Sequence, residues 1–273
     1  MKLSGRIMGS VSLLLVLAST IGCAKLKARD QLVKGVQAFK AGQYERAVNH
    51  FQESIALDPT YDTARLDLAA AYAFQVVPNL DSPENLKIAN KALEGFNEVL
   101  AKNPNDLGAL RQIASIHFNI KQYDQTKIDE QKVIALDPND ADANDMIGAV
   151  NFMQALKNET AIFSAAGITD DGQGTAKKSK DVCQKLATAN SALIADALKY
   201  LQQAVAINPT YEDAMNYINL VYRRKANIEC GDDAARKADV AMADQWVQKA
   251  MGARKANEAA KEKKLQGGID MSK

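Results

Sequence analysis

Apolar and small residues recur along the chain at helical spacing, and a proline follows each run. Steps of four and three residues place three side chains on one face of a helix. A proline five residues later ends that helix, because it has no backbone N–H to donate. Four segments share this spacing: Ala47–Phe51–Ser54–Pro59, Ala92–Phe96–Val99–Pro104, Thr126–Glu130–Val133–Pro138 and Ala197–Leu201–Ala204–Pro209. A fifth segment, Ala243–Val247–Ala250, lacks the proline.

The pattern also predicts a helix ahead of each of these, with small residues where the two helices would meet. In the preceding helices the small residues are Gly35, Ala69, Ala114 and Gly148. In the following helices they are Ala47, Ala92, Ala197 and Ala243. Small side chains allow two helix axes to approach closely, so each pair is expected to form a hairpin. One hairpin cannot bury its apolar face alone, so neighbouring hairpins are expected to stack.

This arrangement resembles the tetratricopeptide repeat (TPR), a helix–turn–helix unit of 34 residues. The step from Pro104 to Pro138 has that length, and the order of small and large residues agrees best in repeats one and three. The resemblance implies an all-α fold, an α-solenoid of about five TPR-like repeats. The expected repeats cover about 28–61, 62–106, 107–140, 141–211 and 212–252. The remaining residues, 253–273, are expected to form a charged tail that starts helical and frays after Leu265.

Repeats two, four and five contain insertions between their two helices, of about 11, 37 and 12 residues. Ser82-Pro83-Glu84 is typical of a helix N-terminus. The stretch 165–180 is rich in glycine and charge, which predicts a loop. The insertions have two interpretations, which the sequence leaves open. They are either tolerated surface variation or a shaped edge that contacts a partner.

Residues 1–22 have the layout of an export signal. Lys2 and Arg6 precede an apolar stretch over residues 7–21 that contains no acid and is too short to span a bilayer. The end of the stretch, Ser19-Thr20-Ile21-Gly22-Cys23, resembles the lipobox of bacterial lipoproteins, although that family usually has leucine where Thr20 stands. The resemblance implies a mature chain that begins at Cys23 and is multiply acylated there, with palmitate among the expected lipids. It implies a short tether at 23–27 and a location on the outer membrane, facing the periplasm.

The other two cysteines, Cys183 and Cys230, form an even pair in a chain that is expected to be exported. Each lies in an insertion, one in repeat four and the other in repeat five. A disulfide that ties the two insertions together is one hypothesis. Two free thiols are the alternative, and the cysteine count does not decide between them.

Composition and motifs indicate no catalytic or cofactor chemistry. Without residues 1–22 the chain has 32 basic and 33 acidic residues, which gives no sign of nucleic-acid binding. His50 and His117 have no Cys or acid at metal-ligand spacing, and no glycine-rich phosphate loop or nucleophile elbow is present. The acidic segments 139–145 and 231–239 are interpreted as helix starts. We therefore expect no metal, no cofactor and no enzyme activity.

In the TPR family, partners usually lie against the first helices of the repeats. The residues expected there combine aromatic, apolar and basic side chains, which are typical anchors of protein recognition. They are Phe39, Lys40, Phe74, Arg111, Phe118, Asn119, Phe152, Met153, Arg223 and Arg224. The alternative is that the aromatic ones simply pack between repeats.

The resemblances together predict a non-enzymatic, membrane-anchored scaffold that binds a protein or peptide in the bacterial cell envelope. An accessory lipoprotein that assists envelope assembly, or the export of a polysaccharide or protein, is the alternative. Fold alone cannot identify the partner.

Overall fold

The computed structural model describes residues 23–267, and within that range every regular element is a helix. The all-α repeat fold expected from the sequence is confirmed. The chain divides into two compact units, the first ending at Gln122 and the second beginning at Tyr123. Residues 1–22, where the export signal is expected, and residues 268–273 lie outside the described residues.

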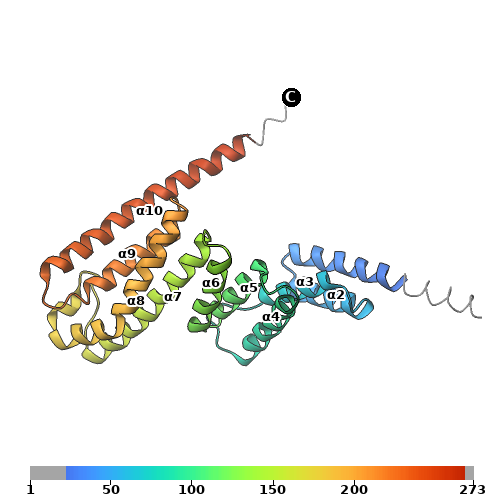
Figure 1. Cartoon of the computed structure of the whole chain (residues 1–273), viewed down its shortest axis with the longest axis horizontal. Coiled ribbons are helices and arrows are strands. Elements are labelled where there is room, and N and C mark those ends of the chain that lie inside the picture. Colours follow the sequence, from blue (N-terminus) through green and yellow to red (C-terminus); the bar gives the residue numbers. More distant parts are fainter. Residues whose placement is uncertain (1–22, 268–273) are drawn as a thin grey trace, which may run out of the picture. The chain divides into compact units, whose positions relative to one another are not determined.

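The first unit contains both helices of repeats one and two and the first helix of repeat three. They are a helix over 23–40, α2 (Tyr44–Leu57), α3 (Asp62–Ala73), α4 (Pro83–Lys102) and α5 (Leu107–Asn119). In this unit α2 packs on α3, α3 on α4 and α4 on α5 (Figure 1). The turns between these helices fall where the repeat pattern predicts them.

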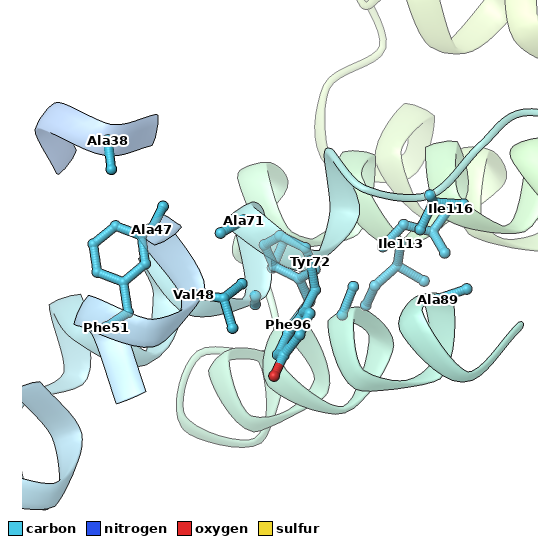
Figure 2. Close-up of a cluster of buried hydrophobic side chains, with 14 residues drawn as sticks. Ala38, Ala47, Val48, Phe51, Ala71, Tyr72, Ala89, Phe96, Ile113 and Ile116 are labelled. Carbon is cyan, nitrogen blue, oxygen red and sulfur yellow. The ribbon is translucent and has the colours of Figure 1, made fainter. Parts of the chain in front are cut away.

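The core of the first unit depends on the small residues of the pattern. A Cβ atom placed on Gly35 would lie 2.4 Å from the Phe51 ring, so only glycine lets that ring reach the first helix. Ala47 and Phe51 are buried, as are Tyr72 of α3 and Phe96 of α4. Figure 2 shows these side chains in one continuous apolar cluster. The predicted pairing of small and large residues is therefore how the hairpins pack.

The second unit contains the second helix of repeat three and both helices of repeats four and five. They are α6 (Tyr123–Leu136), α7 (Ala141–Ala166), the short 3-10 helix η1 (Thr175–Lys178), α8 (Lys180–Ile207), α9 (Glu212–Ala226) and α10 (Asp233–Gly267). Helices α7, α8 and α9 lie side by side (Figure 1). The long insertion of repeat four mainly lengthens α7 and α8, which have 26 and 28 residues.

The core of the second unit repeats the glycine contact of the first. A Cβ atom on Gly148 would lie 2.4 Å from Cγ of Leu201, which is fully buried. Ala197 and Ala204 lie on the same helix as Leu201 and are buried with it. The close approach of α7 and α8 therefore has the same origin as that of the first hairpin.

Three helix starts that the sequence predicts are confirmed by their capping hydrogen bonds. Ser82 accepts a hydrogen bond from the backbone N–H of Asn85, with Pro83 as the first helical residue of α4. Asp140 caps α7 by accepting from the N–H of Ala143. Asp232 accepts from the N–H three residues ahead of it, at the start of α10. The acidic segments 139–145 and 231–239 thus supply helix caps.

Both ends of the described range are helical. Residues 23–27, which the sequence predicts as a short tether, belong to the helix over 23–40. Residues 253–267 continue α10, with their side chains exposed after Ala253 where they are described. The alanine- and lysine-rich composition favours the helix even without a covering partner.

Candidate functional site

The first unit contains a cluster of three aromatic rings in mutual contact. The Phe39 ring lies edge-on to the Tyr44 ring at 5.4 Å and to the Phe74 ring at 5.0 Å, measured between ring centroids. Phe74 and Tyr44 also contact each other at 5.4 Å. Phe74 remains 56% exposed, and Lys40, the neighbour of Phe39 in sequence, is exposed. We call Phe39, Tyr44 and Phe74 the aromatic cluster.

The connector between α3 and α4, residues 74–82, begins at Phe74 of this cluster and contains the first part of the insertion of repeat two. The side chain of Asn85, which is buried, accepts from the N–H of Val77 at 2.8 Å and donates to the carbonyls of Val77 and Leu80 at 3.0 and 2.8 Å. Asn79 has a left-handed backbone, with φ at 63°, and its N–H donates to the carbonyl of Asn119. These bonds fix the connector while Val77 and Leu80 stay exposed.

The remaining candidates of the first unit lie on α5. Arg111 is exposed, whereas Phe118 and Asn119 are half-buried. Asn119 supports the connector through its backbone carbonyl. The first unit therefore holds six of the ten residues that the sequence assigns to a partner groove, and Phe74 is the most exposed aromatic among them.

The four candidates in the second unit make contacts inside the protein. Phe152 is only 8% exposed and packs against Tyr217 in the core, with Met153 half-buried beside that core. Arg223 donates to the carbonyl of Gly172 at 3.1 Å and pairs with Asp244 at 2.8 Å.

Arg224 belongs to a buried ion-pair network beneath the insertion of repeat four. Its guanidinium contacts the carboxylate of Glu159 and lies 2.7 Å from Asp170. Glu159 is 1% exposed, and burial raises the pKa of its carboxyl to about 7, against the opposing effect of Arg224. A guanidinium with two internal carboxylates is not available to a partner. The physical reason is the insertion, which folds back over α9 and supplies Asp170.

The insertion of repeat four is held from several sides. Cys183 of α8 and Cys230, which follows α9, are joined in a disulfide, the pair that the cysteine count singled out. Asn227 accepts from the backbone N–H of Ala176 at 3.2 Å, and Arg236 donates to the carbonyl of Gln173 at 2.8 Å. The stretch 165–180, predicted as a loop, is thus tied to α9 and α10.

Sequence reasoning missed an acidic group on the first helices of repeats four and five. Tyr211 donates to the carboxylate of Asp142 at 2.7 Å, and Asp145 lies near both Asp142 and Asp213. Burial, together with the negative charges of Asp213 and Asp142, raises the pKa of Asp145 to about 7. Acids at the starts of both α7 and α9 were the available signal, but the segment 139–145 was interpreted only as a helix start. This group favours a positively charged contact over a negative one.

Among residues 23–267, no group of three or more His, Cys, Asp or Glu side chains is arranged to hold a metal ion. His50 has its Nδ1 atom 2.7 Å from the side-chain oxygen of Gln31. The same described residues include no helix long and apolar enough to cross a bilayer. Cys23, the expected lipid site, is exposed and outside any disulfide.

Comparison with known proteins supports the fold. Residues 37–75 match the family model for the TPR repeat. The chain is similar to the solved structure of MamA residues 41 to the end from Desulfovibrio magneticus RS-1, at 17% identity and a TM-score of 0.55, covering 84% of this chain and 96% of that one. It is similar to the MamA RS-1 ArsTM double mutant at 18% identity and a TM-score of 0.55, covering 85% and 97%.

A crystal structure of MamA protein gives 15% identity and a TM-score of 0.53, covering 85% of this chain and 94% of that one. At these identities the likeness concerns the fold alone. Among curated protein sequences, none matches the chain significantly. The chain thus contains a TPR repeat and has the helical-repeat fold of TPR proteins.

Proposed function

We propose that this protein is a lipid-anchored, non-enzymatic scaffold of the bacterial cell envelope that binds a protein segment. The observation that carries the proposal is the aromatic cluster of the first unit. Phe74 contacts the rings of Phe39 and Tyr44, yet more than half of its surface faces solvent. A preordered aromatic surface with little conformational freedom to lose is the type of anchor that dominates protein–protein interfaces.

The surroundings of the cluster suit an extended segment with apolar and acidic side chains. Lys40 stands next to the cluster in sequence, and the fixed connector adds the apolar side chains of Val77 and Leu80. A segment that covers Phe74 would remove its exposed apolar area from water, which is the main driving force of association. A carboxylate of the same segment would then face Lys40.

Export and anchoring rest on two supports. The lipobox resemblance assigns the acyl group to Cys23, whose side chain is exposed. The bond between Cys183 and Cys230 supports a location outside the reducing cytoplasm, because disulfides persist mainly in oxidising compartments. The proposed location is the outer membrane, with the repeats facing the periplasm.

A crosslinking experiment in intact cells tests the binding surface. A photoreactive amino acid replaces Phe74 in one variant and Leu156, an exposed residue of the second unit, in a control. We expect one dominant crosslinked protein from position 74 that is absent from position 156. The double substitution Phe74→Ala and Lys40→Glu should weaken capture of that protein by about tenfold or more. Equal crosslinking from both positions would contradict the proposed surface.

A mass measurement tests the anchor separately. The chain is expressed from its full sequence, and the protein in the membrane fraction is compared with a Cys23→Ala variant. We expect cleavage before Cys23 and acyl chains on that residue in the wild-type protein alone. A membrane-fraction protein that keeps residues 1–22, or has a free thiol at Cys23, would contradict the lipoprotein assignment.

A further inference from the structure

Cys23, the expected anchor residue, belongs to the helix over 23–40, with no coil between them. Cys23 is helical, and so are residues 24 to 27. A helix rises about 1.5 Å per residue, so Val33 lies roughly 15 Å along the axis from Cys23. If acyl chains enter the bilayer at Cys23, the direction of this helix determines which side chains meet the lipid surface.

The inner face of this helix is fixed on α2. The carbonyl of Ala28 accepts a hydrogen bond from the Ser54 hydroxyl at 2.7 Å, and Gly35 meets the Phe51 ring. Ala28 is fully buried. The helix therefore cannot rotate about its axis without leaving its neighbour, and its opposite face is the one that points outward (Figure 1).

The outward face carries an exposed apolar pair, which we call the apolar centre, together with one acid and several basic residues. Successive residues turn by about 100°, which places Leu26, Val33 and Cys23 roughly opposite Ala28. Leu26 is 70% exposed and Val33 is 54% exposed. Both are large apolar side chains that this unit does not cover.

Three exposed cations border this apolar centre. The same helical geometry puts Lys27 and Lys34 on one side of it and Arg29 on the other, and all three are exposed. Asp30 lies on the same face between Leu26 and Cys23, and its carboxylate is 2.7 Å from the Nζ atom of Lys34. The face, Cys23 to Lys34, therefore carries a net positive charge beside exposed leucine and valine, the composition of helices that lie in a membrane interface.

We propose that this face lies flat on a bilayer that contains anionic phospholipid, with Leu26 and Val33 at headgroup level. The inference rests on the proposed acylation of Cys23, and it adds a second contact that orients the first repeat. The bilayer is the occupant that the observations favour, because the face begins at the anchor and its charge complements anionic headgroups. Basic flanks keep their charged ends in the interface while their aliphatic stems lie along the apolar boundary.

Lysine footprinting on the reconstituted protein tests this contact. The acylated protein is purified from membranes and reconstituted into phosphatidylcholine vesicles with and without phosphatidylglycerol, and acetylation rates are measured by mass spectrometry. We expect Lys27 and Lys34 to react about tenfold more slowly with phosphatidylglycerol present. Lys255 and Lys261, exposed on α10, are internal controls and should not change. Equal rates at Lys27 and Lys34 in both vesicles would overturn the proposal.

Two charge variants distinguish contact through this face from a general electrostatic attraction between the protein and the membrane. The variant K27E/R29E should lose the protection of Lys34, with unchanged helix content by circular dichroism. The variant K255E/K261E has the same change in charge and should keep that protection. Protection in cells but in neither vesicle would show that a protein covers the face and would overturn the bilayer as occupant.

The proposed acylation of Cys23 and the proposed contact of this face with lipid can be refuted independently. A free Cys23 thiol in the purified protein would contradict the anchor. The footprint with added vesicles on that same protein would still report whether Lys27 and Lys34 meet anionic lipid. If Cys23 is acylated and both lysines react freely in anionic vesicles, the anchor stands and the flat orientation is wrong.

Discussion

Removing the disulfide is the perturbation whose effect on the second unit can be worked out most directly. Cys183 is almost fully buried in a small apolar cluster with Phe163 and Leu186, and its bond to Cys230 joins α8 to the turn that follows α9. The double variant Cys183→Ser and Cys230→Ser keeps similar side-chain sizes. It breaks the crosslink and leaves the helices unchanged.

The sequence separation sets the expected loss of stability. The two cysteines are 47 residues apart, and closing a loop of that size lowers the entropy of the unfolded chain. The chain-entropy relation gives a contribution of about 4 kcal/mol at 25 °C. For a unit of this size that corresponds to a drop in Tm of about 10 °C or to a urea midpoint lower by about 2 M.

Fluorescence of Trp246 during urea unfolding provides the assay. It is the single tryptophan of the chain and lies on α10, so its signal reports the second unit. Cys23→Ser is the matched control and should leave the midpoint unchanged. A free energy of unfolding for the double variant within about 1 kcal/mol of the wild-type value would refute the loop-entropy reasoning. Alkylation of both Cys183 and Cys230 in unreduced protein would refute the bond itself.

Three further changes test packing, charge and the connector. Gly148→Ala should destabilise the second unit by about 1–3 kcal/mol, because the added Cβ would meet Leu201. Gly252 has open space around it, so Gly252→Ala should stabilise α10 slightly. Urea unfolding compares the two variants. Because the pKa of Asp145 is raised to about 7, the folded state holds its proton more tightly than the unfolded state. Stability should therefore fall as pH rises from about 4 to 7. Thermal unfolding of Asp145→Asn should show a smaller slope, because Glu159, whose pKa is also raised to about 7, still contributes. Asn85→Ala should cost the first unit about 1–3 kcal/mol in thermal unfolding and speed amide exchange in the connector, and an unchanged exchange rate would contradict its assigned role.

The helices and their closest contacts could be predicted because they depend on residues near one another in sequence. Gly35 and Phe51 are 16 positions apart in one hairpin, and their sizes already indicate that the Phe51 ring packs over Gly35. Helix caps such as Ser82 and Asp140 act within three residues, so a local pattern suffices to find them. Such features need no knowledge of the rest of the fold.

The use of the arginines could not be predicted for the opposite reason. Arg224 pairs with Glu159 and Asp170, which lie 65 and 54 positions earlier, and no local pattern indicates that this insertion folds back on α9. The local sequence around an arginine does not show whether its side chain is free or already paired with acids. Asn85 is similar, since its role depends on the path of the connector that it holds.

The bond between Cys183 and Cys230 turns α9 and most of α8 into part of a covalently closed ring. A protease that cuts once inside the ring, for example in the turn after Asn208, leaves two fragments that stay attached and migrate as one species without reductant. A nicked molecule would therefore pass for an intact one in a non-reducing gel. That turn is accordingly a place where the chain could be opened, or a tag inserted, without separating the repeats on either side.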